Sequence, residues 1–318
     1  MQLSNHNWRA LNGQIAVGVL AGLTSETDQV MAFPSWLDRS QYPFAAHAIA
    51  LTDGTVHYVD EGSGEVLLFV HGTPTWSFEY RHLIKTLAKR HRCIAPDHLG
   101  FGLSARPGGF AYSPEAHASV LREFVDRLGL ERFTLIVHDF GGPIGLPLAL
   151  DRPSRVRRLI MINTWAWPLD DDPKMAKGAR LIGGAIGRLL YRYANASLKL
   201  IMPSAYGDRN KLTPSIHAQY LNVFSDRNAR VLVLHALARS LLGSRAHYQS
   251  LLDRIATLGG IPVLIIWGMK DTAFQPYQLE RWRSLLPDAV VAEIPGAGHW
   301  PHEEEPAAVT AAIERFLQ

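Results

Sequence analysis

The chain has 318 residues, of which 47% are hydrophobic and 19% are charged, and its formal net charge is +3. This is the composition of an ordinary globular protein that is long enough to bury a large core. The small net charge and the lack of a long basic run argue against nucleic-acid binding. The single cysteine, Cys93, excludes an intrachain disulfide, and we expect it to be a buried free thiol in a reducing cytoplasm.

Residues 1–33 are expected to be a poorly structured N-terminal extension. Within them, residues 14–23 form an apolar stretch that is too short to span a bilayer and makes a poor signal sequence. Met31, just before Phe33 and Pro34, would be a natural start for the folded protein. No other stretch approaches transmembrane length, so no membrane partner is expected.

Two early segments, residues 46–51 and 55–60, predict an antiparallel hairpin that turns at Asp53 and Gly54. Six later apolar runs alternate with helical patterns, which predicts a mostly parallel sheet covered on both faces. The predicted strands are residues 66–70, 93–95, 133–137, 159–162, 263–267 and 290–294. Helices are expected near residues 83–89, 119–128 and 142–150.

Strand patterns stop between residues 164 and 230, where helical patterns appear instead, as at residues 177–193 and 214–224. A helical segment at this place is typical of an insertion into an α/β domain. The predicted α/β core is therefore formed by residues 34–163 and 231–318.

The sharpest local motif is Val-His-Asp-Phe-Gly-Gly at residues 137–142, which follows a predicted strand and precedes a helix. A tight turn in this context lifts its central side chain, Asp139, above the sheet. Gly141 and Gly142 allow the helix and strand to approach closely. Many hydrolases have serine at the central position, whereas a carboxylate is already ionised at neutral pH and can displace a leaving group from an sp³ carbon. We therefore interpret Asp139 as a nucleophile, with a helix N-cap as the structural alternative.

An ester formed on Asp139 needs a base that activates water. His299 lies on a glycine-rich loop after the last predicted strand, from which it can reach the top of the sheet. Asp271 follows the buried run that ends at Trp267, where a carboxylate can accept from an imidazole and fix its tautomer. The order nucleophile, acid, base is that of α/β hydrolases. The alternative for Asp271 is an ordinary turn residue.

Backbone N–H groups that stabilise an oxyanion are expected from two positions. In an α/β hydrolase they come from the residue after the His-Gly pair of the first central strand and from the residue after the nucleophile. In this chain those residues are Thr73, in the sequence His71-Gly72-Thr73-Pro74, and Phe140. Asp97 is interpreted as a structural residue of its loop.

The chain resembles the haloalkane dehalogenase family of α/β hydrolases over roughly residues 34–318. The resemblance is carried by five motifs: His71-Gly72-Thr73-Pro74-Thr75-Trp76, Pro96-Asp97-His98-Leu99-Gly100-Phe101-Gly102-Leu103-Ser104, His138-Asp139-Phe140-Gly141-Gly142, Gly268-Met269-Lys270-Asp271 and Gly298-His299. It implies an α/β-hydrolase fold in which residues 164–230 form a helical cap over the active site.

The resemblance also implies a two-step hydrolysis. Asp139 displaces halide from a haloalkane, and His299, oriented by Asp271, activates the water that hydrolyses the aspartyl ester. The products are an alcohol, a halide and a proton, and neither a cofactor nor a metal is implied. The implied partners are a small apolar substrate and water, while the cap and the N-terminal extension are candidates for homo-oligomer contacts.

The chain departs from the family at the halide site. The family usually has tryptophan directly after the nucleophile, with an indole N–H that holds the halide, but Phe140 has no such donor. Many members also have asparagine where this chain has Thr73. Trp76 and Trp165 are candidate replacements, with packing as the alternative for both, and Trp167 is expected to be a packing residue.

Three other functions stay open at this point. Epoxide hydrolases share the nucleophile and triad and add cap tyrosines that donate to the epoxide oxygen. The tyrosines in the cap region here are Tyr191, Tyr193, Tyr206 and Tyr220. Related enzymes decarboxylate β-lactones with the same aspartate. A non-catalytic binding protein is a more remote alternative, because all three triad residues are present.

Overall fold

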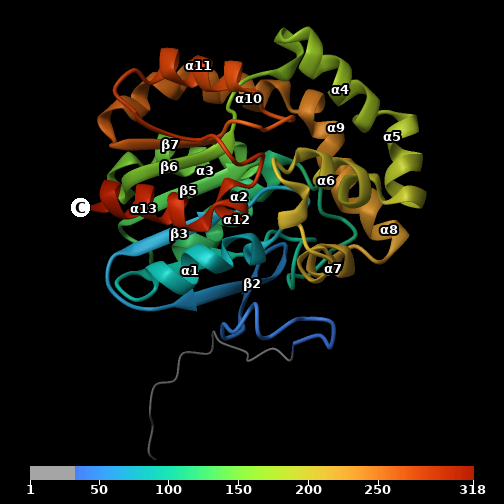
Figure 1. Cartoon of the computed structure of the whole chain (residues 1–318), viewed down its shortest axis with the longest axis horizontal. Helices are drawn as coiled ribbons and strands as arrows, with labels where there is room; N and C mark the ends of the chain where they lie inside the picture. Colours follow the sequence, from blue (N-terminus) through green and yellow to red (C-terminus); the bar gives the residue numbers. More distant parts are fainter. Residues whose placement is uncertain (1–32) are drawn as a thin grey trace, which may run out of the picture.

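An eight-stranded sheet forms the centre of the molecule in the computed structural model, which describes residues 33–318 (Figure 1). The strand order is β1-β2-β4-β3-β5-β6-β7-β8. The strands are β1 (His47–Leu51), β2 (Gly54–Glu61), β3 (Val66–Val70), β4 (Arg92–Pro96), β5 (Phe133–Asp139), β6 (Val156–Thr164), β7 (Val263–Gly268) and β8 (Val290–Ile294). The expected N-terminal extension, its apolar stretch and the alternative start at Met31 lie outside the described residues, apart from Phe33.

The strand pairing confirms the predicted α/β-hydrolase fold. β1 and β2 form the antiparallel hairpin, and β2 pairs antiparallel with β4. All the other neighbouring strands are parallel. β5 is buried along its whole length between β3 and β6, as its continuous apolar run predicts for a strand covered on both faces. Since parallel strands end at the same edge of a sheet, the residues after β3, β5, β6 and β7 are brought together.

Helices cover both faces of the sheet. α1, α12 and α13 pack together on one face, and α2, α3 and α10 on the other, as Figure 1 shows. The core helices are α1 (Arg81–Leu87), α2 (Pro114–Arg127), α3 (Gly141–Asp151), α10 (Arg245–Arg254), α11 (Pro276–Leu285), α12 (Pro301–Glu304) and α13 (Pro306–Leu317). The start of α2 follows local rules, because the Ser113 hydroxyl accepts from the Ala116 N–H and Pro114 occupies the first turn.

The cap is built only from helices and turns between β6 and β7. Its helices are α4 (Pro173–Gly183), α5 (Ala185–Leu189), α6 (Met202–Ala205), α7 (Pro214–Val223), α8 (Arg227–Ala229) and α9 (Ala236–Gly243). Wider helical turns, η4 (Leu190–Ala194), η5 (Ser197–Ile201) and η7 (Arg230–His235), join them. α9, which follows the predicted boundary at residue 230, packs against α4. None of the described helices is long and apolar enough to cross a membrane.

A buried polar cluster ties the cap to the core. Arg81 of α1 forms an ion pair with Glu303 of α12, and both side chains are almost fully buried. Two cap hydroxyls also donate to Glu303, that of Tyr206 at 3.1 Å and that of Tyr220. These bonds satisfy a carboxylate that would otherwise be costly to bury. The cluster therefore fixes α6 and α7 relative to the sheet.

Candidate active site

Asp139 lies at the end of β5 in the turn that the sequence predicts. Its φ is +50°, in the left-handed region that a nucleophile turn requires. A Cβ on Gly141 would clash with the Val70 carbonyl oxygen, and one on Gly72 would clash with the Asp139 carboxylate. The Thr164 hydroxyl donates to the Asp139 carbonyl oxygen at 2.6 Å, which fixes the turn from the neighbouring strand.

The two carboxylate oxygens of Asp139 have different surroundings. Oδ1 accepts from the Thr73 backbone N–H at 2.8 Å, so this predicted oxyanion donor lies beside the Asp139 carboxylate. Oδ2 lies 3.4 Å from His299 Nε2. Phe140 follows Asp139 directly and its ring lines the cavity described below, while the oxyanion role of its N–H stays a prediction. Oδ1 therefore faces the Thr73 backbone, whereas Oδ2 faces the His299 ring.

His299 and Asp271 come together with Asp139 as expected. His299 Nδ1 lies 2.7 Å from Asp271 Oδ2, and the His299 backbone N–H donates to the Ala205 carbonyl oxygen of the cap at 2.9 Å. Burial lowers the pKa of His299, but attraction to Asp271 and hydrogen bonds with Asp139 and Asp271 outweigh burial and raise it to about 10. The two carboxylates therefore favour the protonated form of the His299 ring.

Asn163 is a site residue that the sequence did not identify. Its side-chain N–H donates to Asp271 Oδ2 at 2.8 Å, and its side-chain oxygen accepts from the Gly268 N–H at 2.8 Å. The other Asp271 oxygen accepts from the N–H groups of Ala273 and Phe274. With these partners, Asp271 is held at one fixed position against His299. The one signal that the sequence offered was the place of Asn163 directly after the predicted strand at residues 159–162.

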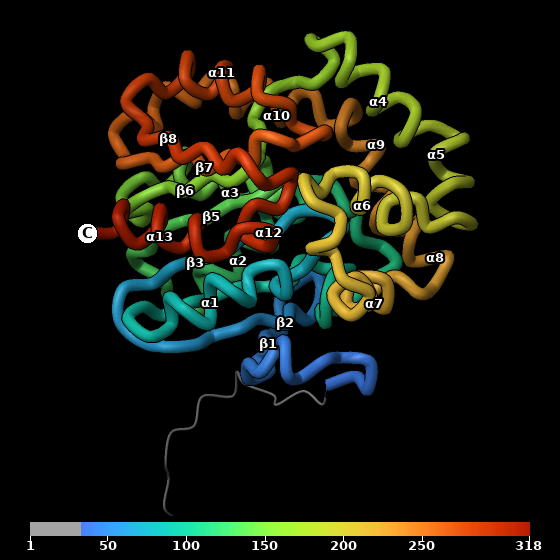
Figure 2. Tube along the Cα trace, viewed as in Figure 1, coloured from blue at the N-terminus to red at the C-terminus, as the bar shows by residue number. Residues whose placement is uncertain are grey.

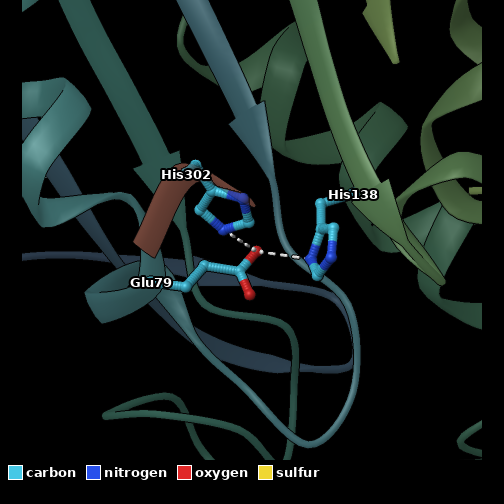
Figure 3. Close-up of side chains that lie close together, drawn as sticks. All are labelled: Glu79, His138 and His302. Atoms are coloured by element: carbon cyan, nitrogen blue, oxygen red, sulfur yellow. Dashed lines mark hydrogen bonds and ion pairs between the residues drawn. The ribbon is translucent and has the colours of Figure 1, made fainter. Parts of the chain in front are cut away.

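A second buried cluster supports His299 from below. Glu79, His138 and His302 are fully buried and their side chains converge, as Figure 3 shows. His138 Nδ1 lies 3.2 Å from Glu79 Oε1, and His138 Nε2 lies 2.8 Å from the His299 carbonyl oxygen. Burial raises the pKa of Glu79, but attraction to His138, the hydrogen bond with His138 and the nearby His302 hold it well below its usual range. The sequence did not identify Glu79 or His302 as residues near the site.

Glu79, His138 and His302 are also the residues within 33–318 whose ligand atoms lie close enough together for a metal ion, within 4.8 Å of one another. Two imidazoles and a carboxylate are donors that zinc accepts. In this structure, however, His138 directly links Glu79 to the backbone of His299. We therefore describe the cluster as support for the His299 loop.

A cavity of about 340 Å³ lies between the core and the cap, with Asp139 and His299 in its wall. Its remaining lining is largely apolar, and includes Trp165, Leu169, Ile182, Leu234 and Phe274. This size and polarity suit a small apolar ligand held against a few polar groups. The Asp139 carboxylate therefore faces a largely apolar space.

The two candidate tryptophans differ in position. Trp165 lines the cavity, where its ring stacks on Phe274 at a centroid distance of 4.9 Å. Trp76 is fully buried but is not part of the cavity wall, and it stacks on Phe78 at 5.5 Å. The position of Trp76 matches the alternative that it is a packing residue and not a halide donor. Trp167 also packs away from the cavity, against Trp282.

Three buried donors on the cavity wall have no hydrogen-bond partner among the described residues. They are the hydroxyl of Thr73 and the indole nitrogens of Trp165 and Trp300. Buried donors are normally paired, so such a group on a cavity wall marks a place for a polar atom of a ligand. The sequence did not single out Trp300, although it directly follows His299.

Asp97 has the structural role expected of it. Its carboxylate accepts from the N–H groups of Ser77 and Leu103 and lies 2.8 Å from His57 Nδ1. His71 contributes by accepting the His98 N–H at 2.9 Å. Both residues therefore fix the loops around Thr73 and do not face the cavity.

Comparisons with known proteins agree with this geometry. Residues 65–306 match the family described as alpha/beta hydrolase fold. Haloalkane dehalogenase 2 of Mycobacterium tuberculosis is 40% identical over 282 residues, which cover 88% of this chain and 97% of that protein. A cis-3-alkyl-4-alkyloxetan-2-one decarboxylase of Shewanella oneidensis is 34% identical over 284 residues, which cover 86% and 89% of the two chains.

The solved structures that resemble this chain include haloalkane dehalogenases. The crystal structure of haloalkane dehalogenase DbeA from Bradyrhizobium elkani matches with a TM-score of 0.77 at 25% identity, covering 86% of this chain and 98% of that one. The fold, the sequence relatives and the predicted motifs thus agree. The chain is a hydrolase and belongs to the haloalkane dehalogenase family of α/β hydrolases.

Proposed function

We propose that this protein hydrolyses the carbon–halogen bond of small haloalkanes through a covalent ester on Asp139. One observation carries the proposal: a carboxylate nucleophile contacts the Thr73 N–H and His299 in the wall of an apolar cavity. A haloalkane has no charge, so it gains from transfer into such a cavity. The 40% identical relative named haloalkane dehalogenase 2 supports the same activity.

In the first step, Asp139 Oδ2 attacks the carbon that bears the halogen. The new C–O bond forms as the C–X bond breaks, and the halide leaves with the bonding electrons. Oδ1 keeps its hydrogen bond to the Thr73 N–H and becomes the carbonyl oxygen of the ester. The nucleophile needs no proton removed, which distinguishes it from a serine.

In the second step, water attacks the ester carbonyl carbon while His299 removes a proton from it. The negative charge that develops on Oδ1 is stabilised by the Thr73 N–H and, in this proposal, by the Phe140 N–H. Collapse of the tetrahedral intermediate releases the alcohol and restores the carboxylate. Asp271 and Asn163 hold the His299 ring in place throughout.

The leaving halide needs donors because Phe140 provides none. We assign this role to the indole N–H of Trp165, assisted by the Thr73 hydroxyl and the Trp300 indole. All three donors line the cavity and lack partners. Trp76 is left out because it does not reach the cavity wall.

Replacing Trp165 by phenylalanine is expected to slow halide release by about 10- to 100-fold, since a hydrogen bond to a charged group contributes ~1.5–3 kcal/mol. The ring stacking on Phe274 can be kept by a phenyl ring, so the loss should come from the missing N–H. The rate of the first turnover would be measured by rapid mixing with a bromoalkane. Trp167→Phe, which alters a buried tryptophan outside the cavity, is the matched control. Equal rates in the two variants would remove Trp165 from the halide site.

The β-lactone decarboxylase alternative is supported by two relatives with that name, at 34% and 30% identity, and by one residue of this chain. The Shewanella oneidensis relative named as an oxetanone decarboxylase is 34% identical, and Phe140 lacks the usual halide donor. The same attack by Asp139 would open an oxetanone ring. The epoxide alternative has less support, because Tyr206 and Tyr220 donate to Glu303 and Tyr193 is exposed, which leaves Tyr191 on the cavity wall.

A substrate panel separates these functions. Purified protein would be offered bromo- and iodoalkanes, an aryl epoxide and a cis-dialkyl oxetanone, each also with Asp139→Asn. Halide release that the variant loses is the expected result. Diol formation or carbon dioxide release without halide release would favour the epoxide or the lactone reaction instead. In the proposed setting the enzyme works in the cytoplasm, with a haloalkane and water as its reactants.

A further inference from the structure

The outer surface of the cap exposes an unusual number of large apolar side chains. We define the cap surface as residues 173–207, from α4 to α6. Seven large apolar residues there are exposed by 36% to 63%: Leu181, Ile186, Leu189, Leu190, Tyr193, Leu200 and Ile201. Elsewhere in residues 33–318, two more reach this level, Tyr277 and Val290. Exposed apolar side chains concentrated in one segment mark a contact surface rather than ordinary scatter.

The same segment is strongly basic. Residues 173–207 contain six basic and no acidic residues: Lys174, Lys177, Arg180, Arg188, Arg192 and Lys199. None of these six forms an ion pair with another described residue. Of the acidic residues that directly precede the segment, Asp170 and Asp171 pair with Arg245, and Asp172 accepts from Tyr277. The cap surface therefore combines exposed apolar groups with a net positive charge.

This combination identifies the kind of partner. Basic side chains around exposed leucine, isoleucine and tyrosine are typical of helices that lie in the interface of an anionic bilayer. A second copy of this chain fits less well, because a symmetric contact would bring the same basic surface against itself. Figures 1 and 2 show α4 and α5 at the outer edge of the molecule, on the side away from α13, where a flat partner can reach them.

We propose that the cap surface docks the protein on a membrane surface that contains anionic phospholipids. This differs from the expectation of no membrane partner, because the sequence does not show which apolar cap residues are exposed. The mouth of the cavity lies at the same surface, since its lining residues Lys174, Gly178 and Ile201 are exposed. A docked cap therefore presents the cavity to apolar molecules dissolved in the bilayer.

Flotation with lipid vesicles tests the proposal on the full chain. The protein is expected to float with mixed phosphatidylcholine–phosphatidylglycerol vesicles, to bind those of phosphatidylcholine alone poorly, and to dissociate at high salt. The variant Lys177→Gln/Arg180→Gln/Arg188→Gln should bind roughly 100-fold more weakly, because each basic residue near an anionic surface contributes about fivefold. Ile186→Ser/Leu189→Ser should also weaken binding. None of these five residues lines the cavity, so activity on a short soluble substrate checks folding.

The matched control changes three exposed basic residues of the core, Lys89→Gln/Arg90→Gln/Arg132→Gln, and is expected to bind like the wild type. Failure of the wild type to float, or equal binding of the cap and control variants, would overturn the proposal. So would a concentration-dependent dimer that Ile186→Ser/Leu189→Ser abolishes, because the partner would then be a second copy. Vesicle binding does not depend on the chemistry of the site, so it succeeds or fails independently of halide release.

Discussion

A His299→Gln variant is expected to release one equivalent of halide per protein molecule and then to stop. The first step needs only the Asp139 carboxylate, whose Oδ1 is already held by the Thr73 N–H. The second step needs a base within reach of the attacking water, and His299 Nε2 lies 3.4 Å from Asp139 Oδ2. Glutamine cannot take that proton, so steady turnover should fall by roughly 10²- to 10⁴-fold, the usual contribution of a general base.

Two measurements follow the trapped enzyme. Halide is counted against protein concentration, and intact mass spectrometry reports the added alkyl group, which peptide mapping should place on Asp139. The double variant Asp139→Asn/His299→Gln serves as the control and should show neither halide nor adduct. Continued turnover by His299→Gln, or an adduct on another residue, would refute the two-step mechanism. A β-lactone substrate offers the same nucleophile a different leaving group, so halide counting also keeps the two chemistries apart.

The elements that the sequence predicted correctly are those encoded locally. β5 is a continuous apolar run followed by a glycine-containing turn, and each part of that pattern follows from neighbouring residues. Asp139, Asp271 and His299 each follow a predicted strand, and parallel strands bring such positions to one edge. The parallel pairing of β5, β6, β7 and β8 then brings the ends of these strands, and with them the three side chains, to one edge of the sheet.

The features that were missed depend on contacts between distant segments. Asn163 has no motif of its own, and its role comes from bonds to Asp271 and Gly268 across β6 and β7. Trp76 and Trp165 have the same side chain and both follow strands, yet one packs on Phe78 and the other lines the cavity. Exposure of the cap leucines is likewise set by how the cap helices pack, which helical periodicity alone does not determine.

Protein stability is expected to fall as the pH rises from 6.5 to about 10, and His299→Gln should flatten this dependence. The pKa of His299 is raised from 6.5 to about 10 in the folded protein by Asp271 and Asp139. Below pH 6.5 both the folded and the unfolded chain bind the proton, so the stabilisation is fully present. Between the two values only the folded chain binds it, and the free energy of unfolding falls by about 1.4 kcal/mol for each pH unit.

The difference in unfolding free energy between the wild type and His299→Gln, measured by urea denaturation, should therefore shrink over this interval. A constant difference would refute the raised pKa of His299.

The charges around His299 also connect the two chemical steps, because formation of the ester removes the negative charge of Asp139 and leaves only Asp271 beside the ring. Asp139→Asn mimics that loss, so NMR titration of this variant should give His299 a lower pKa than in the wild type. An unchanged pKa would show that Asp271 alone holds the proton, and that alkylation does not help to release the base for the second step.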